Sequence, residues 1–435
     1  MSQTLRSGDS SAGQGSHIAT GDYAKVVPCL REPDAAGLLR LWARLRQALG
    51  SAKPIVLPWK GFRAALFSSF ALLCSLAFAA IVAGQGTSLY PFPLDRFGIN
   101  VALEYGEVTH YDVGRLRVGW YLDYRFRERA ARPHGMQYAQ VVRVRDIAIP
   151  LDQEGCEAFW EASGLGRAVE ANPGVLWLIG NEPDTQEQDE RFPADYAAIY
   201  HCLYYFIKGR DPTARLAAPN IVQPTPLRLQ WLDMVLYEYQ AAYGQRMPVD
   251  VWSIHNQILR EDRHGWGCGI PPGISADQGM LYSVYDNANI GIFRQHVLHF
   301  RQWMRARGER EKPLIISEYG VLMPSEYLGG GDPQYGDEVV KAFMRDSFDY
   351  LLSAADELLG YSADGHRLVQ QWAWYSLNDK IIDLETFVGY NGSLFDWRYP
   401  HYPGVITQFG LEFARYTSWL AAKDLQLPLL LRRQR

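Results

Sequence analysis

The stretch GVLWLIGNEPDTQ, residues 174–186, decides the fold and points to a site. Its first half is almost continuously apolar, as expected of a strand that is covered on both faces in a parallel sheet. Its second half turns polar at Asn181, Glu182 and Asp184. Reactive groups of barrel enzymes collect at the carboxyl ends of parallel strands. The stretch therefore predicts a buried strand that presents an amide and a carboxylate at such an edge.

Strand and helix patterns alternate along the rest of the chain. Seven further apolar segments predict strands at 96–103, 115–124, 138–147, 215–222, 249–256, 312–320 and 368–379. Helical spacing follows the third to the eighth strand, at 157–173, 194–212, 227–244, 291–308, 337–359 and 404–421. The first two connections are too short for full helices. Eight such units predict an α/β fold, a (β/α)₈ TIM barrel over 96–421 with a tail at 422–435, and a doubly wound open sheet is the alternative.

An uncharged segment precedes the predicted barrel. Residues 64–84, AALFSSFALLCSLAFAAIVAG, carry no charge, and about 20 apolar residues suffice to span a bilayer as a helix. Lys53, Lys60 and Arg63 lie just before this segment, so the positive-inside rule predicts a cytoplasmic N-terminus, a linker at 85–95 and a barrel outside the cytoplasmic membrane. A cleaved signal peptide is the competing interpretation.

The region before this predicted transmembrane helix differs in charge from the rest. Residues 1–63 hold nine basic and four acidic residues, net +5, whereas the remainder holds 34 and 44, net −10. The acidic main body argues against a nucleic-acid partner. Residues 1–33 are rich in Ser and Gly, which predicts disorder, and 34–50 have the spacing of a short amphipathic helix.

The five cysteines show no metal-binding pattern. They stand at 29, 74, 156, 202 and 268, without a CxxC pair or Cys/His ligand spacing. No HxxxH motif and no glycine-rich phosphate loop after a strand is present, so we expect neither a metal nor another cofactor. A disulfide between Cys156 and Cys202 is compatible with an extracytoplasmic barrel, but the sequence does not establish it.

Two carboxylates stand at the ends of predicted strands. Glu182 follows the fourth strand and Glu318 closes the seventh, 136 residues later. Facing carboxyl groups cleave glycosidic bonds: one protonates the leaving oxygen, and the other attacks the anomeric carbon or activates water. A spacing of about 5–5.5 Å corresponds to retention of configuration and about 6.5–9.5 Å to inversion. The donor needs a raised pKa, which burial and a second carboxylate provide.

These two motifs resemble a known group of enzymes. WLIGNEPD (177–184) is similar to the strand-four Asn-Glu signature of glycoside hydrolase clan A, and LIISEYG (314–320) to its strand-seven Glu. GSLFDW (392–397) resembles the loop after the eighth strand of many members. The resemblance implies a retaining (β/α)₈ glycosidase with Glu182 as acid/base and Glu318 as nucleophile. It also implies that Asn181 hydrogen-bonds the sugar 2-hydroxyl.

Further substrate contacts follow from the resemblance and from the strand ends. His255 matches a strand-six His of several clan A families, and Trp374 matches the strand-eight Trp that floors the sugar site. Many members have a Tyr shortly after that His, beside the nucleophile. Here Asn256 follows instead, so that role is unfilled or is filled by Tyr319 or Tyr375. The expected substrate-binding residues are Asn181, His255, Asn256, Trp374, Trp120, Tyr319 and Tyr375.

The sequence as a whole predicts a membrane-anchored retaining glycosidase that acts on an oligo- or polysaccharide. A non-catalytic carbohydrate-binding barrel, a transglycosylase with the same glutamates and an envelope scaffold protein are the alternatives. The long loop at 255–279 carries Trp266 and Arg263, which are further candidate substrate contacts. The sugar, the linkage, endo or exo action and the oligomeric state do not follow from the sequence.

Overall fold

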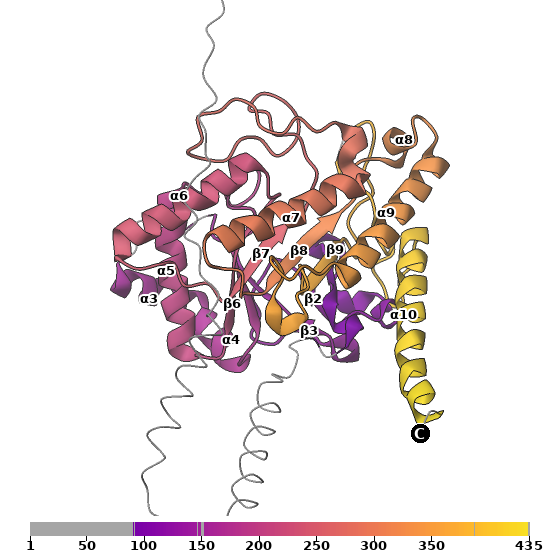
Figure 1. Ribbon diagram of the computed structural model, residues 1–435, viewed down its shortest axis with the longest axis horizontal. Coiled ribbons are helices and arrows are strands. Elements are labelled where there is room, and N and C mark those ends of the chain that lie inside the picture. Colours follow the sequence, from indigo (N-terminus) through magenta and orange to yellow (C-terminus); the bar gives the residue numbers. More distant parts are fainter. Residues whose placement is uncertain (1–89, 91, 146, 149–151, 387, 434–435) are drawn as a thin grey trace, which may run out of the picture. The chain divides into compact units, whose positions relative to one another are not determined.

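Nine parallel strands form a single sheet at the centre of the described part of the chain (Figure 1). The computed structural model describes Tyr90 and residues 92–145, 147–148, 152–386 and 388–433. The strands are β1 (Phe97–Asn100), β2 (Trp120–Leu122), β3 (Gln137–Tyr138), β4 (Gln140–Val142), β5 (Leu176–Ile179), β6 (Arg215–Ile221), β7 (Val251–His255), β8 (Leu314–Gly320) and β9 (Gln371–Tyr375). All eight predicted strands are present, and the third one is divided into β3 and β4.

The strand order is that of a barrel. Neighbouring strands follow the order β3-β2-β1-β9-β8-β7-β6-β5-β4. The two ends of this order, β3 and β4, are separated by Ala139 alone, so one extended segment pairs with β2 at its start and with β5 at its end. The amide of Ala139 donates to the carbonyl of Tyr121 at 2.9 Å. The sheet therefore curls into a nearly closed TIM-like barrel, and the open-sheet alternative is wrong.

Helices cover the outside of the barrel (Figure 1). They are α3 (Gln153–Ser163), α4 (Leu165–Ala171), α5 (Pro193–Arg210), α6 (Pro226–Tyr243), α7 (Ile290–Ala306), α8 (Ser325–Leu328), α9 (Pro333–Ser353) and α10 (Gln408–Arg433). The helix predicted at 157–173 is broken because Gly164 adopts a left-handed conformation, with φ 84°. Helix α10 continues past residue 421, where the sequence predicted its end.

The first two connections contain no α-helix, as the sequence predicted. Short 3₁₀ helices connect β1 to β2, at Leu103–Tyr105, Val108–His110 and Val113–Leu116, and a fourth connects β2 to β3, at Pro133–Gly135. The folded body also begins before the predicted boundary at residue 96. Tyr90 is buried, and the buried Arg96 pairs with Asp364 at 2.6 Å.

Side chains alternate between two apolar layers. The larger layer lies between strands and helices and includes Phe97, Trp177, Trp252, Trp372 and Trp374. The smaller layer fills the barrel interior; its members are Trp120, Leu122, Ala139, Val141, Leu176, Leu178, Ala217, Val251, Ile315 and Ala373. Successive strand residues point to opposite faces, so the parity of a residue decides whether it faces helices or the interior.

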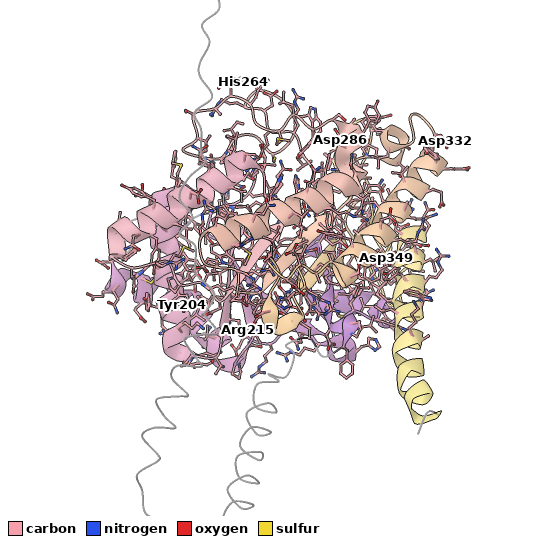
Figure 2. The ribbon with its side chains drawn as sticks, in the orientation of Figure 1. Tyr204, Arg215, His264, Asp286, Asp332 and Asp349 are labelled. Atoms are coloured by element: carbon pink, nitrogen blue, oxygen red, sulfur yellow. A yellow bond between two sulfur atoms is a disulfide. The ribbon has the colours of Figure 1, made fainter. Side chains whose placement is uncertain are left out.

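The long loops gather at one end of the barrel. Figure 2 shows His264, in the loop after β7, and Asp332, at the start of α9, at the top of the view. Arg215, the first residue of β6, lies at the lower edge. The upper end is therefore the carboxyl end of the strands, where a barrel carries its site.

The membrane prediction falls on another part of the chain. None of the helices among the described residues is long and apolar enough to span a bilayer. The predicted transmembrane helix at 64–84, together with the predicted N-terminal segment 1–63, lies outside the described residues.

A disulfide joins two helices of the outer layer. Cys156 of α3 and Cys202 of α5 are bonded, with their Cα atoms 6.0 Å apart. Cys268 is a buried free thiol. The disulfide left open by the sequence is thus formed in this structure.

Candidate active site

Glu182 lies in a tight turn that β6 fixes. The residue follows β5 and has a positive φ of 47°, which is uncommon for a side chain other than Gly, Asn or Asp. Its amide donates to the carbonyl of Asn220 at 3.0 Å, and the Asn220 side chain donates to the carbonyl of Gly180 at 2.7 Å. Asn220 itself has φ 59°, a conformation that Asn tolerates. Two neighbouring strand ends thus fix the backbone that carries Glu182.

A β-bulge aims Glu318 inward. Ile254 of β7 pairs with Ile316 of β8, but the next pair is His255 with Glu318, so β8 carries Ser317 as one extra residue. The Ser317 hydroxyl accepts a hydrogen bond from Ser253 at 2.9 Å. Strict alternation would send Glu318 toward the helices; the bulge lets Ser317 and Glu318 both face the interior.

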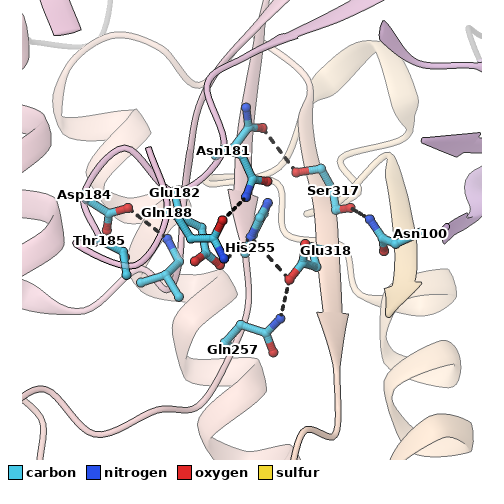
Figure 3. Close-up of polar contacts among 12 residues, drawn as sticks. Asn100, Asn181, Glu182, Asp184, Thr185, Gln188, His255, Gln257, Ser317 and Glu318 are labelled. Carbon is cyan, nitrogen blue, oxygen red and sulfur yellow. Dashed lines mark hydrogen bonds and ion pairs between the residues drawn. The ribbon is translucent and has the colours of Figure 1, made fainter. Parts of the chain in front are cut away.

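The two glutamates meet at His255 (Figure 3). Nδ1 of His255 lies 2.8 Å from Oε1 of Glu182 and 3.8 Å from Oε1 of Glu318. One oxygen of each glutamate and one nitrogen of His255 all lie within 4.8 Å of one another. The structure thus brings the ends of β5, β7 and β8 together at these three residues.

Two donors hold Glu318, and the sequence analysis missed both. The Tyr124 hydroxyl donates to Oε2 at 2.5 Å, and Nε2 of Gln257 donates to Oε1 at 3.0 Å. Tyr124 comes from the loop after β2 and has φ 63°. Tyr124 thus contacts Glu318 in the way expected of a tyrosine beside the nucleophile. The sequence had predicted that this role is unfilled or is filled by Tyr319 or Tyr375. Alternation along the second predicted strand puts Tyr124 on the same face as Trp120 and Leu122, which lie in the barrel interior, so the sequence held a signal that could have found it.

Burial and charge set the protonation of the cluster. Burial raises the pKa of Glu182 and Glu318 raises it further, while the hydrogen bond from His255 lowers it. Burial alone would lower the pKa of His255, but Glu318 and Glu182 raise it above its ordinary value. Burial and the charge of Glu318 raise the pKa of Tyr124 well above 10, so the hydroxyl keeps its proton and donates. The arrangement favours a protonated Glu182.

A buried network of ion pairs holds the turn that carries Glu182. Arg228 of α6 bonds Asp184 at 2.7 Å and Glu261 at 3.0 Å, and all three side chains are fully buried. The same guanidinium donates to the carbonyls of Cys268 and Gly269, at 2.8 Å each. Arg228 thus ties the Asn-Glu-Pro-Asp turn to the long loop after β7, and Asp184 has a structural role.

A cavity of about 710 Å³ opens above the glutamates. Asn181, Glu182 and Glu318 line it, and the Asn181 amide donates to Gln188 at 3.2 Å. The aromatic residues of the lining are Tyr105, Tyr124, Trp266, Tyr375 and Tyr390, and its charged residues besides the two glutamates are Glu104, Asp123, Arg125, Arg143, Glu187 and Asp379. Tyr375, which the sequence predicted to bind substrate, lines the cavity, and its hydroxyl donates to Asp379. The lining combines rings with carboxylates.

Trp374 and Tyr319 were predicted to bind substrate, but the structure places both outside the cavity. Both are fully buried in the helix-facing layer, with ring centroids 5.4 Å apart. The Trp374 indole donates to the carbonyl of Gly392, and the Tyr319 hydroxyl contacts Ser347 of α9. Alternation along β9 explains the position of Trp374, because Trp372 and Trp374 share the face toward the helices. Tyr375 then points to the barrel interior.

Trp120 and Asn256 were also misplaced. Trp120 is the first residue of β2 and not the last, so it lies at the amino end of the strands, away from the cavity. Its indole donates to the carbonyl of Arg96. Asn256 points to α7, where it donates to the carbonyl of Phe293 and contacts His296 at 2.8 Å. Arg263 does not line the cavity; it donates to the carbonyls of Ile274 and Ala276 within its own loop.

The same cluster has the spacing of a metal site. Glu182, His255 and Glu318 offer two carboxylates and an imidazole within 4.8 Å of one another. His255 bonds Glu182 directly, and Tyr124 and Gln257 already occupy both oxygens of Glu318. A metal ion would replace these hydrogen bonds, so the network present suits protonation chemistry better than metal binding.

The comparisons with known proteins found likeness in structure only. No protein-family model and no curated protein matches the chain. Among solved structures, the chain resembles a GH128 (subgroup I) endo-β-1,3-glucanase from Amycolatopsis mediterranei, at TM-score 0.45 and 15% identity over 74% of this chain and 99% of that one.

Two other solved structures are similar to the same extent. One is a GH128 (subgroup II) endo-β-1,3-glucanase from Sorangium cellulosum, at TM-score 0.44 and 18% identity over 73% of this chain and 97% of that one. The other is a curdlan-specific exo-β-1,3-glucanase of GH128 subgroup III from Blastomyces gilchristii, at TM-score 0.44 and 15% identity over 74% and 99%. Likeness at this level assigns neither a family nor an activity.

Proposed function

We propose that the protein is a retaining glycoside hydrolase in which Glu182 is the acid/base and Glu318 the nucleophile. The observation that carries this proposal is the meeting of two buried glutamates across a cavity, with oxygen atoms within 4.8 Å of each other. That separation suits direct attack by a carboxylate better than the wider spacing needed to admit a water molecule between carboxylate and sugar.

Each group has a part in the proposed reaction. Protonated Glu182 donates its proton to the leaving oxygen while a Glu318 oxygen bonds to the anomeric carbon, which gives a glycosyl-enzyme. Glu182, now ionised, takes a proton from water as the water displaces Glu318. Tyr124 and Gln257 orient Glu318 for the first step, and Asn181 offers its amide to the sugar.

We also propose that residues 64–84 anchor the protein in the cytoplasmic membrane, with the barrel outside. The charge pattern around that segment supports this orientation. The disulfide between Cys156 and Cys202 is consistent with it, because disulfides persist in oxidising compartments and are rare in the cytosol.

The function is tested with the purified full-length protein in detergent. A screen of aryl glycosides and neutral polysaccharides identifies a substrate, and NMR of the first product reads its anomeric configuration. We expect retention, and we expect Glu182→Gln and Glu318→Gln each to lose at least about a thousandfold in kcat. Inversion would exclude the mechanism, and binding without turnover would favour the carbohydrate-binding barrel. Transfer to sugar in place of water would favour the transglycosylase.

A further inference from the structure

Trp266 is an exposed ring at the edge of the cavity. It lies in the long loop after β7, lines the cavity and remains 40% exposed. An indole offers a flat apolar face of the kind that packs against the apolar face of a pyranose ring. None of the proposed catalytic steps uses Trp266, although it lies within the lining of the same cavity.

The loop that carries Trp266 is held in a fixed conformation. Gly267 has φ 111°, and a Cβ atom at this position would lie 2.1 Å from the carbonyl oxygen of Arg260. The amide of Cys268 donates to that same carbonyl at 3.0 Å. Arg228 donates to the carbonyls of Cys268 and Gly269 in the same loop. A ring on such a loop is positioned before any ligand arrives, which lowers the entropic cost of binding.

Trp266 belongs to the Glu182 side of the cavity. Arg228 joins its loop to Asp184, two residues after Glu182, and the charge of Glu182 contributes to the raised pKa of the Cys268 thiol, whose main cause is burial. Because Glu182 protonates the leaving oxygen in the proposed mechanism, the leaving part of the sugar chain lies on its side. Trp266 is therefore on the side of the leaving group.

A second group of rings belongs to the opposite side. Tyr105, from the 3₁₀ helix after β1, lines the cavity, and its ring centroid lies 5.3 Å from that of Trp397. Tyr375 and Asp379 follow on β9 and its loop, and the charge of Glu318 contributes to the raised pKa of each, after burial as the main cause. β1 and β9 are neighbours and lie away from β5 in the strand order. This second group is on the side of the sugar that Glu318 attacks.

We infer, on the basis of the proposed function, that the cavity binds a sugar chain across both sides of the scissile bond and cleaves it internally. Trp266 then supports the leaving part and Tyr105 the part that becomes attached to Glu318. The cavity lining holds six carboxylates against two guanidinium groups, those of Arg125 and Arg143, so its charge repels a polyanionic chain. The substrate class is a glycan without carboxylate or sulfate groups.

The test compares two substrates of the same sugar in the full-length protein. A pentasaccharide occupies both sides of the cavity, whereas an aryl monoglycoside places a sugar only on the Glu318 side. For Trp266→Ala we expect kcat/KM to fall about tenfold more with the pentasaccharide than with the aryl glycoside. For Tyr105→Ala we expect similar losses with both, because both substrates place a sugar on its side.

The control is Tyr237→Ala, since Tyr237 is 71% exposed on α6 and does not line the cavity; both rates should equal those of the wild type. Equal losses with both substrates for Trp266→Ala would overturn the inference, as would release of only mono- or disaccharides from an end-labelled polysaccharide. Preferential cleavage of a uronate-rich or sulfated glycan would overturn the charge assignment. Absence of hydrolysis of any glycan by the wild type would instead refute the proposed function itself, and this inference with it.

Discussion

Glu182 and Glu318 differ in how the fold surrounds them, and that difference supports the roles proposed for them. Glu318 accepts hydrogen bonds from Tyr124 and Gln257, which fix the orientation of its carboxylate. Glu182 is buried beside another carboxylate, which favours its protonated form. In the proposed mechanism, two chemically identical side chains therefore have opposite tasks, attack by Glu318 and proton donation by Glu182.

His255 is expected to set the alkaline limit of activity. Its hydrogen bond and charge lower the pKa of Glu182, against the effect of burial. His255→Phe removes both contributions, so the pKa of Glu182 rises further and the carboxyl keeps its proton to higher pH. We therefore expect the alkaline limb of the profile of kcat/KM against pH to move to higher pH. His201→Phe, on helix α5, is the control, and an alkaline limb that stays in place or moves to lower pH would contradict this role.

Tyr124 is expected to act on the chemical step more than on binding. Tyr124→Phe removes only the hydroxyl that donates to Glu318. We expect kcat with an aryl glycoside to fall about 10- to 100-fold while KM changes little, because the orientation of the nucleophile is lost and the cavity remains. Steady-state kinetics check this result. Tyr121→Phe is the matched control, since its hydroxyl donates to the carbonyl of Ala131 away from the cavity.

At the scale of elements, the sequence predicted a strand and the residue at its end correctly where an apolar run closes in a polar residue. Apolar runs predicted β5 and β8, and their polar ends predicted Glu182 and Glu318. Glu318 reaches the interior only through the bulge at Ser317, which no single-strand pattern shows. Trp374 was misplaced because alternation gives two faces without saying which one is inside. The pairing of strands that are distant in sequence decides where a bulge forms and which face of a strand lies inside the barrel.

Among the contacts between elements, we expect those of Arg228 to contribute strongly to stability. Arg228→Ala leaves Asp184 and Glu261 buried without a counter-ion, which costs about 3–5 kcal/mol of the free energy of unfolding. We expect a clear fall in Tm by calorimetry. Arg129→Ala removes an exposed pair with Glu128 and should leave Tm unchanged. Equal Tm values for the two variants would show that the network does not stabilise the fold.

At the scale of the whole molecule, the disulfide is expected to make thermal stability depend on whether the surroundings are oxidising or reducing. It closes a loop over 46 residues between α3 and α5, which the chain-entropy model values at about 4 kcal/mol. We expect Cys156→Ser/Cys202→Ser to melt at lower temperature than the wild type in calorimetry without reductant. Dithiothreitol should lower the wild-type Tm toward that of the double variant. A Tm of the oxidised wild type equal to that of the double variant would contradict the contribution of this bond.

Arg228 also bears on how this barrel can change its substrate. The loop that carries Trp266 is fastened through Glu261 and two carbonyls to the same guanidinium that holds the turn of Glu182. Exchange of this loop in engineering or in evolution would disturb the turn of Glu182 together with Trp266. A transplanted loop therefore has to bring a residue equivalent to Glu261 into a barrel that already carries the arginine and the aspartate.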